Sequence, residues 1–234
     1  MITTTMTADE MKKELQKDDS LIEERVYSFL ERNATKIRRE NKRTGKLITI
    51  SKSLSVRSNE NLYRINLVGC YAKTRKTGIE VQANNISKSS ILCDSTTGNR
   101  DLYELVTGKN EFEVHVYSAH FIKRYNQRYF EGKLTFEEAC DTLLKRNNRM
   151  LVLVKYDKYG KTGFLKCEAK IEDGVALGYY DDKKNIYHFC TFVSDNLLVE
   201  SQEHLDKESI IGNYVSQLVH NEQQIIKDLP VKII

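Results

Sequence analysis

The residue types best suited to chemistry lie in one short segment, from Ser118 to Arg128. On a helix capped by Ser118, the side chains of His120, Arg124 and Arg128 are four residues apart and share one face. An imidazole that titrates near neutral pH can transfer the proton of a hydroxyl group, and guanidinium groups can neutralise charge that develops on a phosphate. The grouping therefore indicates metal-independent cleavage of RNA, with His120 as acid or base and the two arginines as an electrostatic clamp.

An ordinary solvated helix explains the same side chains. Charged residues are common on exposed faces, and a spacing of four arises often by chance. The apolar side chains of this segment are Phe121, Ile122, Tyr125 and Tyr129. This stripe alone accounts for a helix, so only the polar face needs a functional explanation. The sequence leaves both interpretations open.

Alternation and capping signals predict the elements around this segment. Residues 112–117 alternate apolar and polar side chains, as a half-buried strand requires, and lead directly into the helix. A second helix is predicted after the capping box Thr135-Phe-Glu-Glu138. Further strands are then predicted at 150–156, 163–171, 175–180 and 186–193, and a last helix at about 205–227. The short, turn-rich connections between these strands favour an antiparallel meander.

The N-terminal part is predicted to begin with helix. Thr7-Ala-Asp-Glu10 fits a capping box, and apolar residues recur at helical spacing after Asp18-Asp19-Ser20, which predicts one amphipathic helix or two. Strands are predicted at 47–50, 62–68 and 78–82. The polar segments 52–61 and 88–100 are predicted as loops.

These elements define a fold class and a division of the chain. We predict an α+β protein with an antiparallel sheet, helices packed on one face, and a helical N-terminal segment. A boundary near the second polar segment would divide the chain into a helical and β module with the basic run at 1–100, and an α+β domain with a C-terminal helix at 101–234.

The strongest charge cluster lies between Arg32 and Lys46, where seven basic residues accompany one acid, Glu40. Such density supplies several partners for phosphates and predicts nucleic-acid binding that weakens steeply with salt. The predicted contact residues are Arg38, Arg39, Lys42 and Arg43. The solvated C-terminal end of a helix, where the dipole favours cations, explains the run as well. The density of charge slightly favours binding.

Composition limits the class of protein. The chain has 234 residues, of which 40% are hydrophobic and 30% charged, a balance typical of folded rather than disordered proteins. No apolar run is long enough to span a bilayer, and the start lacks the layout of a secretory signal, so we predict a cytoplasmic protein without a membrane partner. Five scattered cysteines without a Cys-x-x-Cys pair predict reduced, structural thiols.

The remaining histidines give no sign of a metal centre. His115, His204 and His220 are isolated in the sequence, and no two histidines have the spacing of a helical metal site. His188 is interpreted as a structural residue of a strand. We therefore predict neither a metal nor a cofactor.

The order of elements from 112 to 199 resembles the compact toxin-type ribonuclease fold, the group that includes barnase, RelE and BrnT. The shared features are Ser118-x-His120-x-x-x-Arg124-x-x-x-Arg128 after a strand, a helix with a basic last turn, and a meander that ends in Thr191-Phe-Val. The segment is similar in particular to uncharacterised bacterial domains of this group that open with Ser-x-His-x-x-x-Arg and finish with a threonine on the last strand.

The resemblance implies that His120, Arg124, Arg128 and Thr191 gather over the sheet as an active site. Thr191 alone is also explained as a β-branched residue that favours strands. Two features depart from the pattern. Compact toxins lack a long N-terminal half, and the tyrosine or second histidine often found late in such sites has no firm counterpart here. His188 is at odd spacing from Thr191, so simple alternation predicts that the two face opposite sides of the strand.

Two functions from different classes follow from these observations. The first is a metal-independent RNA-cleaving or RNA-binding protein with a toxin-like ribonuclease fold and RNA as its partner. The second is a non-enzymatic interaction or assembly protein, for example an accessory or structural component of a phage or mobile element, whose partner is another protein or a second copy of the chain. Fold alone does not decide between them.

Overall fold

The computed structural model of the chain describes residues 1–45, 48, 50–75, 78–82, 85–95, 97–107, 112–147, 150–158 and 163–194. The helix predicted at about 205–227 lies outside the described residues, as do Leu47 and Thr49 of the strand predicted at 47–50 and the basic residue Lys46. No helix within the described ranges is both long enough and apolar enough to cross a bilayer.

The N-terminal sequence forms a single helix, α1 (Ala8–Thr44). Its predicted capping box is confirmed, because the Thr7 side chain accepts a hydrogen bond from the Glu10 amide while the Glu10 carboxylate accepts one from the Thr7 amide. Asp18 does not start a second helix, since its carboxylate accepts hydrogen bonds from Asn61 and Tyr63 instead. Gly45 ends the helix in the left-handed region, at φ 66°.

Ten strands within the described residues form one sheet. They are β1 (Ile50–Arg57), β2 (Leu62–Arg75), β3 (Gly78–Gln82), β4 (Asn85–Cys93), β5 (Arg100–Thr107), β6 (Phe112–Tyr117), β7 (Met150–Lys158), β8 (Leu165–Ile171), β9 (Gly174–Asp181) and β10 (Ile186–Ser194). The order is β1-β2-β4-β5-β6-β10-β9-β8-β7, and β3 pairs with the outer part of β2. All pairs are antiparallel except β6 with β10, and the meander predicted for β7 to β10 is confirmed.

The sheet runs without a break through residue 100, because β4 and β5 pair from Lys88 with Leu105 to Cys93 with Arg100. Both halves of the predicted division therefore contribute strands to one sheet. The boundary near residue 100 stays a prediction.

Two segments predicted as loops are strands instead. Residues 52–57 belong to β1 and residues 88–93 to β4, and β5 was not predicted at all. These strands were not predicted because they contain many polar side chains, which are typical of loops. Ser89 and Ser90 are buried because their hydroxyls donate to the backbone oxygens of Arg64 and Leu62 in the neighbouring β2.

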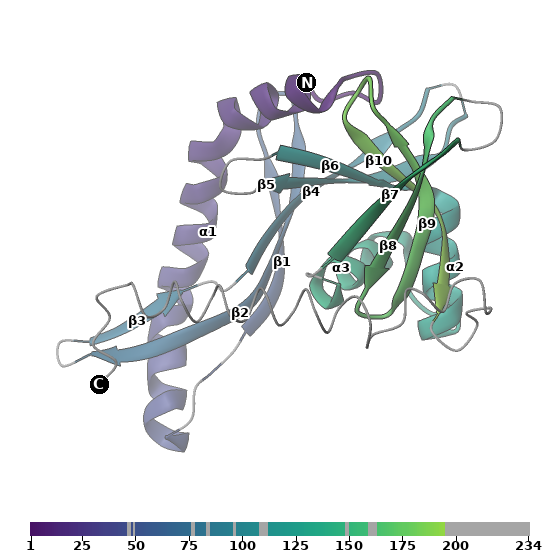
Figure 1. Cartoon of the computed structure of the whole chain (residues 1–234). Helices are drawn as coiled ribbons and strands as arrows, with labels where there is room; N and C mark the ends of the chain where they lie inside the picture. The colour runs from purple at the N-terminus through teal and green to yellow at the C-terminus, as the bar shows by residue number, and fades with distance from the viewer. Residues whose placement is uncertain are drawn as a thin grey trace, which may run out of the picture.

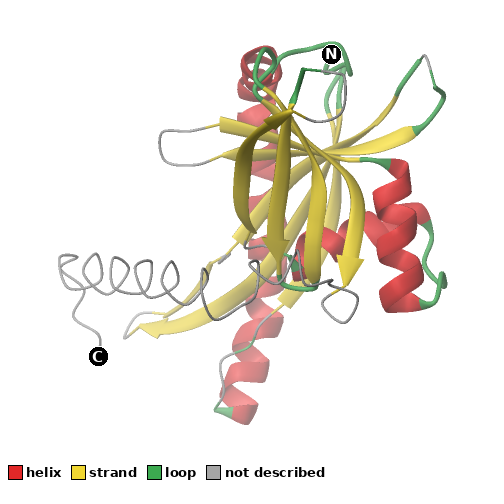
Figure 2. Cartoon of the chain, turned by 45° about the vertical axis from the view of Figure 1, so that its right-hand side comes forward, coloured by secondary structure: helices red, strands yellow, loops and turns green. Residues whose placement is uncertain are grey.

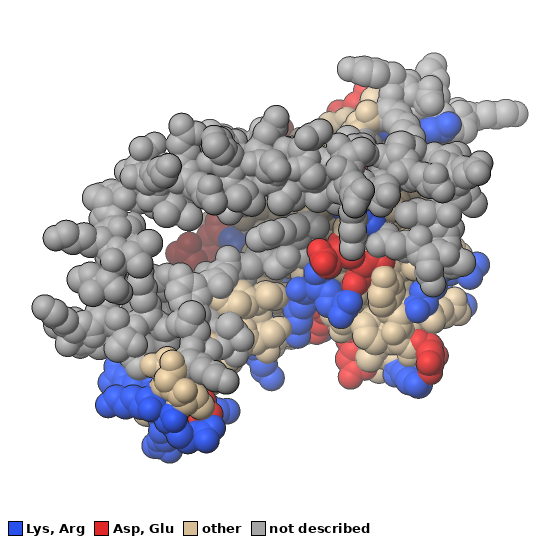
Figure 3. Space-filling view, turned by 60° about the horizontal axis from the view of Figure 1, so that its bottom comes forward, with Lys and Arg blue, Asp and Glu red and all other residues tan. Residues whose placement is uncertain are grey.

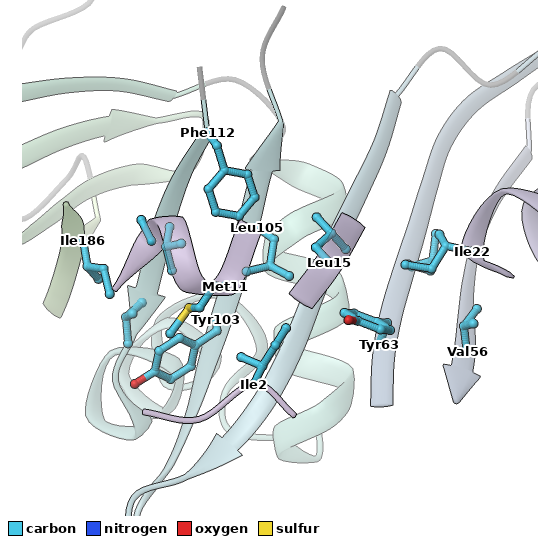
Figure 4. Close-up of a cluster of buried hydrophobic side chains, with 14 of the residues drawn as sticks. Ile2, Met11, Leu15, Ile22, Val56, Tyr63, Tyr103, Leu105, Phe112 and Ile186 are labelled. Atoms are coloured by element: carbon cyan, nitrogen blue, oxygen red, sulfur yellow. The ribbon is translucent and has the colours of Figure 1, made fainter. Parts of the chain in front are cut away.

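Helices cover both faces of the sheet. Helices α2 (Ala119–Phe130) and α3 (Phe136–Arg146) share one face, and α1 covers the other, as Figures 1 and 2 show. Alternation along β5 reflects this arrangement, since Tyr103 and Leu105 pack toward α1 while Leu102 packs toward α2 and α3. Figure 4 shows the core beneath α1, where Met11 and Leu15 meet side chains of the sheet. The predicted α+β class is confirmed.

Candidate active site on helix α2

The start of α2 is fixed to two strands. Ser118 caps the helix as predicted, because its Oγ accepts a hydrogen bond of 3.1 Å from the Phe121 amide. The same hydroxyl donates to the backbone oxygen of Cys190 in β10, at 3.1 Å. The Ala119 amide donates to Oδ1 of Asp101 in β5, at 2.8 Å. The first turn, which contains His120, is thereby held in a defined position over the sheet.

The predicted apolar stripe faces the sheet. Phe121, Ile122 and Tyr125 are buried, and their neighbours in the core include Phe189 and Phe192 of β10. Helix α2 is therefore held by packing on one side, and its opposite side is open to solvent.

The exposed side of α2 lines an open pocket of about 160 Å³. The described residues around it are His120, Lys123, Arg124 and Gln127. The structure thus brings His120 and Arg124 together, as the helical spacing led us to expect, and adds Lys123 and Gln127, which the sequence analysis did not include. One imidazole, one ammonium and one guanidinium around a concave surface form a group suited to an anionic oxygen.

Arg128 is engaged elsewhere. Its guanidinium donates a hydrogen bond to the backbone oxygen of Phe192 and lies over the ring of the same residue, 5.9 Å from the ring centre. Arg128 is not among the described residues that line the pocket. In this structure it attaches the last turn of α2 to β10.

Thr191 is not brought to the pocket either. Phe189 and Phe192 both pack in the core beneath α2, although they are three residues apart, because the pairing of β10 with β9 shifts register between Phe189 and Thr191. This β-bulge resets the alternation, so Thr191 and His188 both lie on the face of β10 away from α2. Simple alternation predicted opposite faces for these two residues and is wrong at this position.

His188 has a structural role on that far face. Its ring stacks on Tyr179 of β9, with ring centres 4.7 Å apart and 13° between the planes. Burial lowers the pKa of His188 to about 4. The ring is therefore neutral at physiological pH, in accord with its interpretation as a structural residue.

A buried polar network beneath α2 was missed by the sequence analysis. Asp173, in the turn between β8 and β9, accepts hydrogen bonds from Tyr125 at 2.7 Å, from Arg146 Nε at 2.8 Å and from Asn147 at 3.0 Å. Burial alone would raise the pKa of Asp173, but hydrogen bonds from Arg146, Tyr125 and Asn147 outweigh it and hold the pKa below its usual value. The network joins α2, α3 and the meander.

A second missed cluster surrounds His115 on β6, on the face opposite to α1. His115 pairs directly with Glu104 across the β5–β6 ladder, and its Nε2 lies 3.1 Å from a carboxylate oxygen of Glu113. Its Nδ1 lies 3.7 Å from Oε2 of Glu104, which also accepts a hydrogen bond from Tyr117. Glu113, His115 and Tyr117 alternate in sequence, and this period of two is the signal that could have revealed the cluster.

The described residues contain no group of three or more His, Cys, Asp or Glu side chains placed to hold a metal ion. No family model, no curated protein and no solved structure matches this chain.

Replacement of Ser118 by alanine is expected to lower the free energy of unfolding by about 1 kcal/mol, because the cap of α2 is lost. Urea denaturation of the two proteins measures the change. Ser118→Asp, which keeps an acceptor for the Phe121 amide but cannot donate to Cys190, should fall between them. An alanine variant as stable as the parent would show that the cap contributes nothing.

Proposed function

We propose that this protein binds RNA and that the pocket on α2 holds a backbone phosphate and promotes its cleavage without a metal ion. The observation that supports this proposal is the meeting of His120, Lys123 and Arg124 around one open pocket. RNA suits such a site better than DNA, because RNA carries its own nucleophile, the 2′-hydroxyl, next to each phosphate. A cytoplasmic location, which gives access to RNA, belongs to the same proposal.

The proposed reaction needs two proton transfers and a group that stabilises the negative charge on the phosphorane. His120 acts as the base and takes the proton of the 2′-hydroxyl, whose oxygen attacks the phosphorus atom. The bond to the 5′-oxygen breaks, and this oxygen takes a proton from Lys123, which we assign as the general acid. Arg124 stabilises the phosphorane oxygens. The products are a 2′,3′-cyclic phosphate end and a 5′-hydroxyl end.

The test compares cleavage of an end-labelled RNA strand, in the presence of EDTA, by the parent protein and by His120→Gln and Arg124→Gln. We expect His120→Gln to lower the cleavage rate by about 100-fold or more, and Arg124→Gln to lower it by a similar factor. RNA binding should change little in His120→Gln. Arg57→Gln, which removes an exposed guanidinium on β1, is the matched control and should cleave like the parent.

The possible results separate the competing functions. Equal cleavage by parent and His120→Gln would identify a contaminating nuclease and exclude His120 as acid or base. RNA binding without cleavage would leave a binding module. Stable association with a protein partner and indifference to RNA would reject the proposal and favour an interaction or assembly protein, for example a phage or mobile-element component.

A further inference from the structure

The C-terminal half of α1 projects beyond the main body of the sheet, as Figure 1 shows. It lies against β3, the short strand that pairs with the outer part of β2. Ile37 is buried in this half, with only 2% of its surface exposed. We call residues 31–45 of α1 the arm helix. Its apolar side is already covered, so only its charged side is available to a partner.

The outer side of the arm helix carries a dense group of exposed cations. They are Arg32, Lys36, Arg38, Arg39, Lys42 and Arg43. From Arg32 to Gly45 the only acid is Glu40, and its carboxylate is paired with Arg43. Figure 3 shows a blue group at the lower left, on the side where Figure 1 places the C-terminal end of α1.

Helical geometry arranges four of these cations in a row. At 100° per residue, Arg32, Lys36, Arg39 and Arg43 fall within a sector of about 60°. They extend over about 16 Å along the helix axis. A row of positive charge along one side of a helix is suited to a regular polyanion.

The surroundings of this row indicate which polyanion. Residues 31–45 contain no aromatic side chain, so the arm helix has no platform on which unpaired bases could stack. Its buried apolar side leaves nothing to insert into a lipid interface. A nucleic-acid duplex, by contrast, presents its phosphates outward and hides its bases, so it can be bound by charge alone, and the proposed RNA binding makes the RNA duplex the one to expect.

We propose that the arm helix binds the phosphate backbone of double-stranded RNA through the row Arg32, Lys36, Arg39 and Arg43. This inference rests on the proposed RNA binding but not on cleavage, because α1 and α2 lie on opposite faces of the sheet. Binding through this surface is independent of base sequence and falls steeply with salt.

The test titrates a labelled blunt RNA duplex with the full chain and with the triple variant Arg32→Gln, Lys36→Gln and Arg39→Gln. We expect the affinity to fall about tenfold or more, and the slope of log affinity against log salt to decrease in magnitude by about 3, one for each lost phosphate contact. Glutamine favours helix nearly as well as lysine and arginine, so the helical content should be retained and circular dichroism should verify this.

The matched control is the triple variant Lys13→Gln, Lys52→Gln and Lys183→Gln, which has the same change of net charge at scattered exposed positions. It should bind the duplex like the parent. Equal weakening in both variants would overturn the proposal, because only the overall charge would then matter. Preference of the parent for a single strand of the same sequence, or for anionic vesicles, would also overturn it.

Failure of the α2 proposal would be recognised separately. His120→Gln should bind the duplex with the affinity of the parent, whether or not the parent cleaves RNA. Arm-dependent binding without any cleavage would support the arm helix and reject catalysis. Cleavage of single strands that is unaffected by the arm variant, together with unchanged duplex binding, would reject only the arm helix.

Discussion

Between pH 7 and pH 10 the protein is expected to lose about 3 kcal/mol of its folding free energy as His115 gives up its proton. Only 4% of the surface of His115 is exposed, and burial by itself lowers its pKa. The carboxylates of Glu104 and Glu113 outweigh burial and raise the pKa of His115 to about 9, from the ordinary value of 6.5. The hydrogen bond from His115 in turn lowers the pKa of Glu113.

The sign follows from the raised pKa. The folded protein holds the proton on His115 more tightly than the unfolded chain does, so the stabilisation is complete below pH 6.5 and is lost as the pH rises through 9. Urea denaturation at a series of pH values measures the loss. Lysine, tyrosine and cysteine side chains also titrate in alkali, and a difference between two variants removes their shared contribution.

His115→Gln supplies that difference, because glutamine does not titrate, and the alkaline loss should be smaller by about 3 kcal/mol in this variant. The control is His188→Gln. Burial lowers the pKa of His188 to about 4, so its contribution to stability changes between pH 4 and 6.5 and not in alkali. Parallel curves for the parent and His115→Gln above pH 7 would show that His115 is neutral in the folded protein.

Local patterns predicted the elements that carry their own signals. The strand at 112–117, the cap at Ser118 and the capping box at Thr135 all rest on residues close in sequence, and the structure confirms each of them. The pocket residues His120 and Arg124 belong to this group as well, because their shared face follows from helical spacing alone.

Features that depend on a neighbouring strand were not predictable in this way. By residue type, Ser89 and Ser90 are typical of a loop. Only the pairing of β4 with β2 places their hydroxyls where backbone oxygens of β2 accept hydrogen bonds from them. The position of Thr191 depends on a bulge against β9, which no alternation within β10 reveals. His115 becomes part of a charged cluster only through its register with Glu104. Each case needs a pairing between segments that the sequence separates.

Asp173→Ala is expected to lower the free energy of unfolding by about 2–3 kcal/mol, because it removes the acceptor of several buried hydrogen bonds. The loss of the ion pair itself contributes little, since the Arg146 side chain is 48% exposed and water can solvate its charge. Only 3% of the Asp173 side chain is exposed, and its carboxylate is the acceptor for Tyr125, Arg146 and Asn147. Loss of this acceptor leaves the buried hydroxyl of Tyr125 and the amide of Asn147 with one bond fewer. Urea denaturation near pH 7 measures the effect.

Asp182→Ala is the matched control, since Asp182 is an exposed aspartate in the turn between β9 and β10. It should change stability by less than about 0.5 kcal/mol. Equal losses in the two variants would show that the Asp173 network contributes no more than a surface charge. Because the pKa of Asp173 is lowered, its contribution is present above pH 3.8 and is lost as the pH falls through the folded pKa, so the two variants should converge in stability in acid.

The same substitution connects stability with the candidate site. Tyr125 lies on the inner side of α2, one residue after Arg124, so the Asp173 network fixes the rotation of the helix that presents His120 and Arg124. Asp173→Asn keeps the size of the side chain and one acceptor oxygen, and it should lose less stability than Asp173→Ala. If the pocket on α2 cleaves RNA, folded Asp173→Asn should cleave more slowly than the parent, although Asp173 is not among the described residues that line the pocket. Unchanged cleavage in a measurably destabilised Asp173→Asn would mean that packing of Phe121 and Ile122 alone is enough to hold the site.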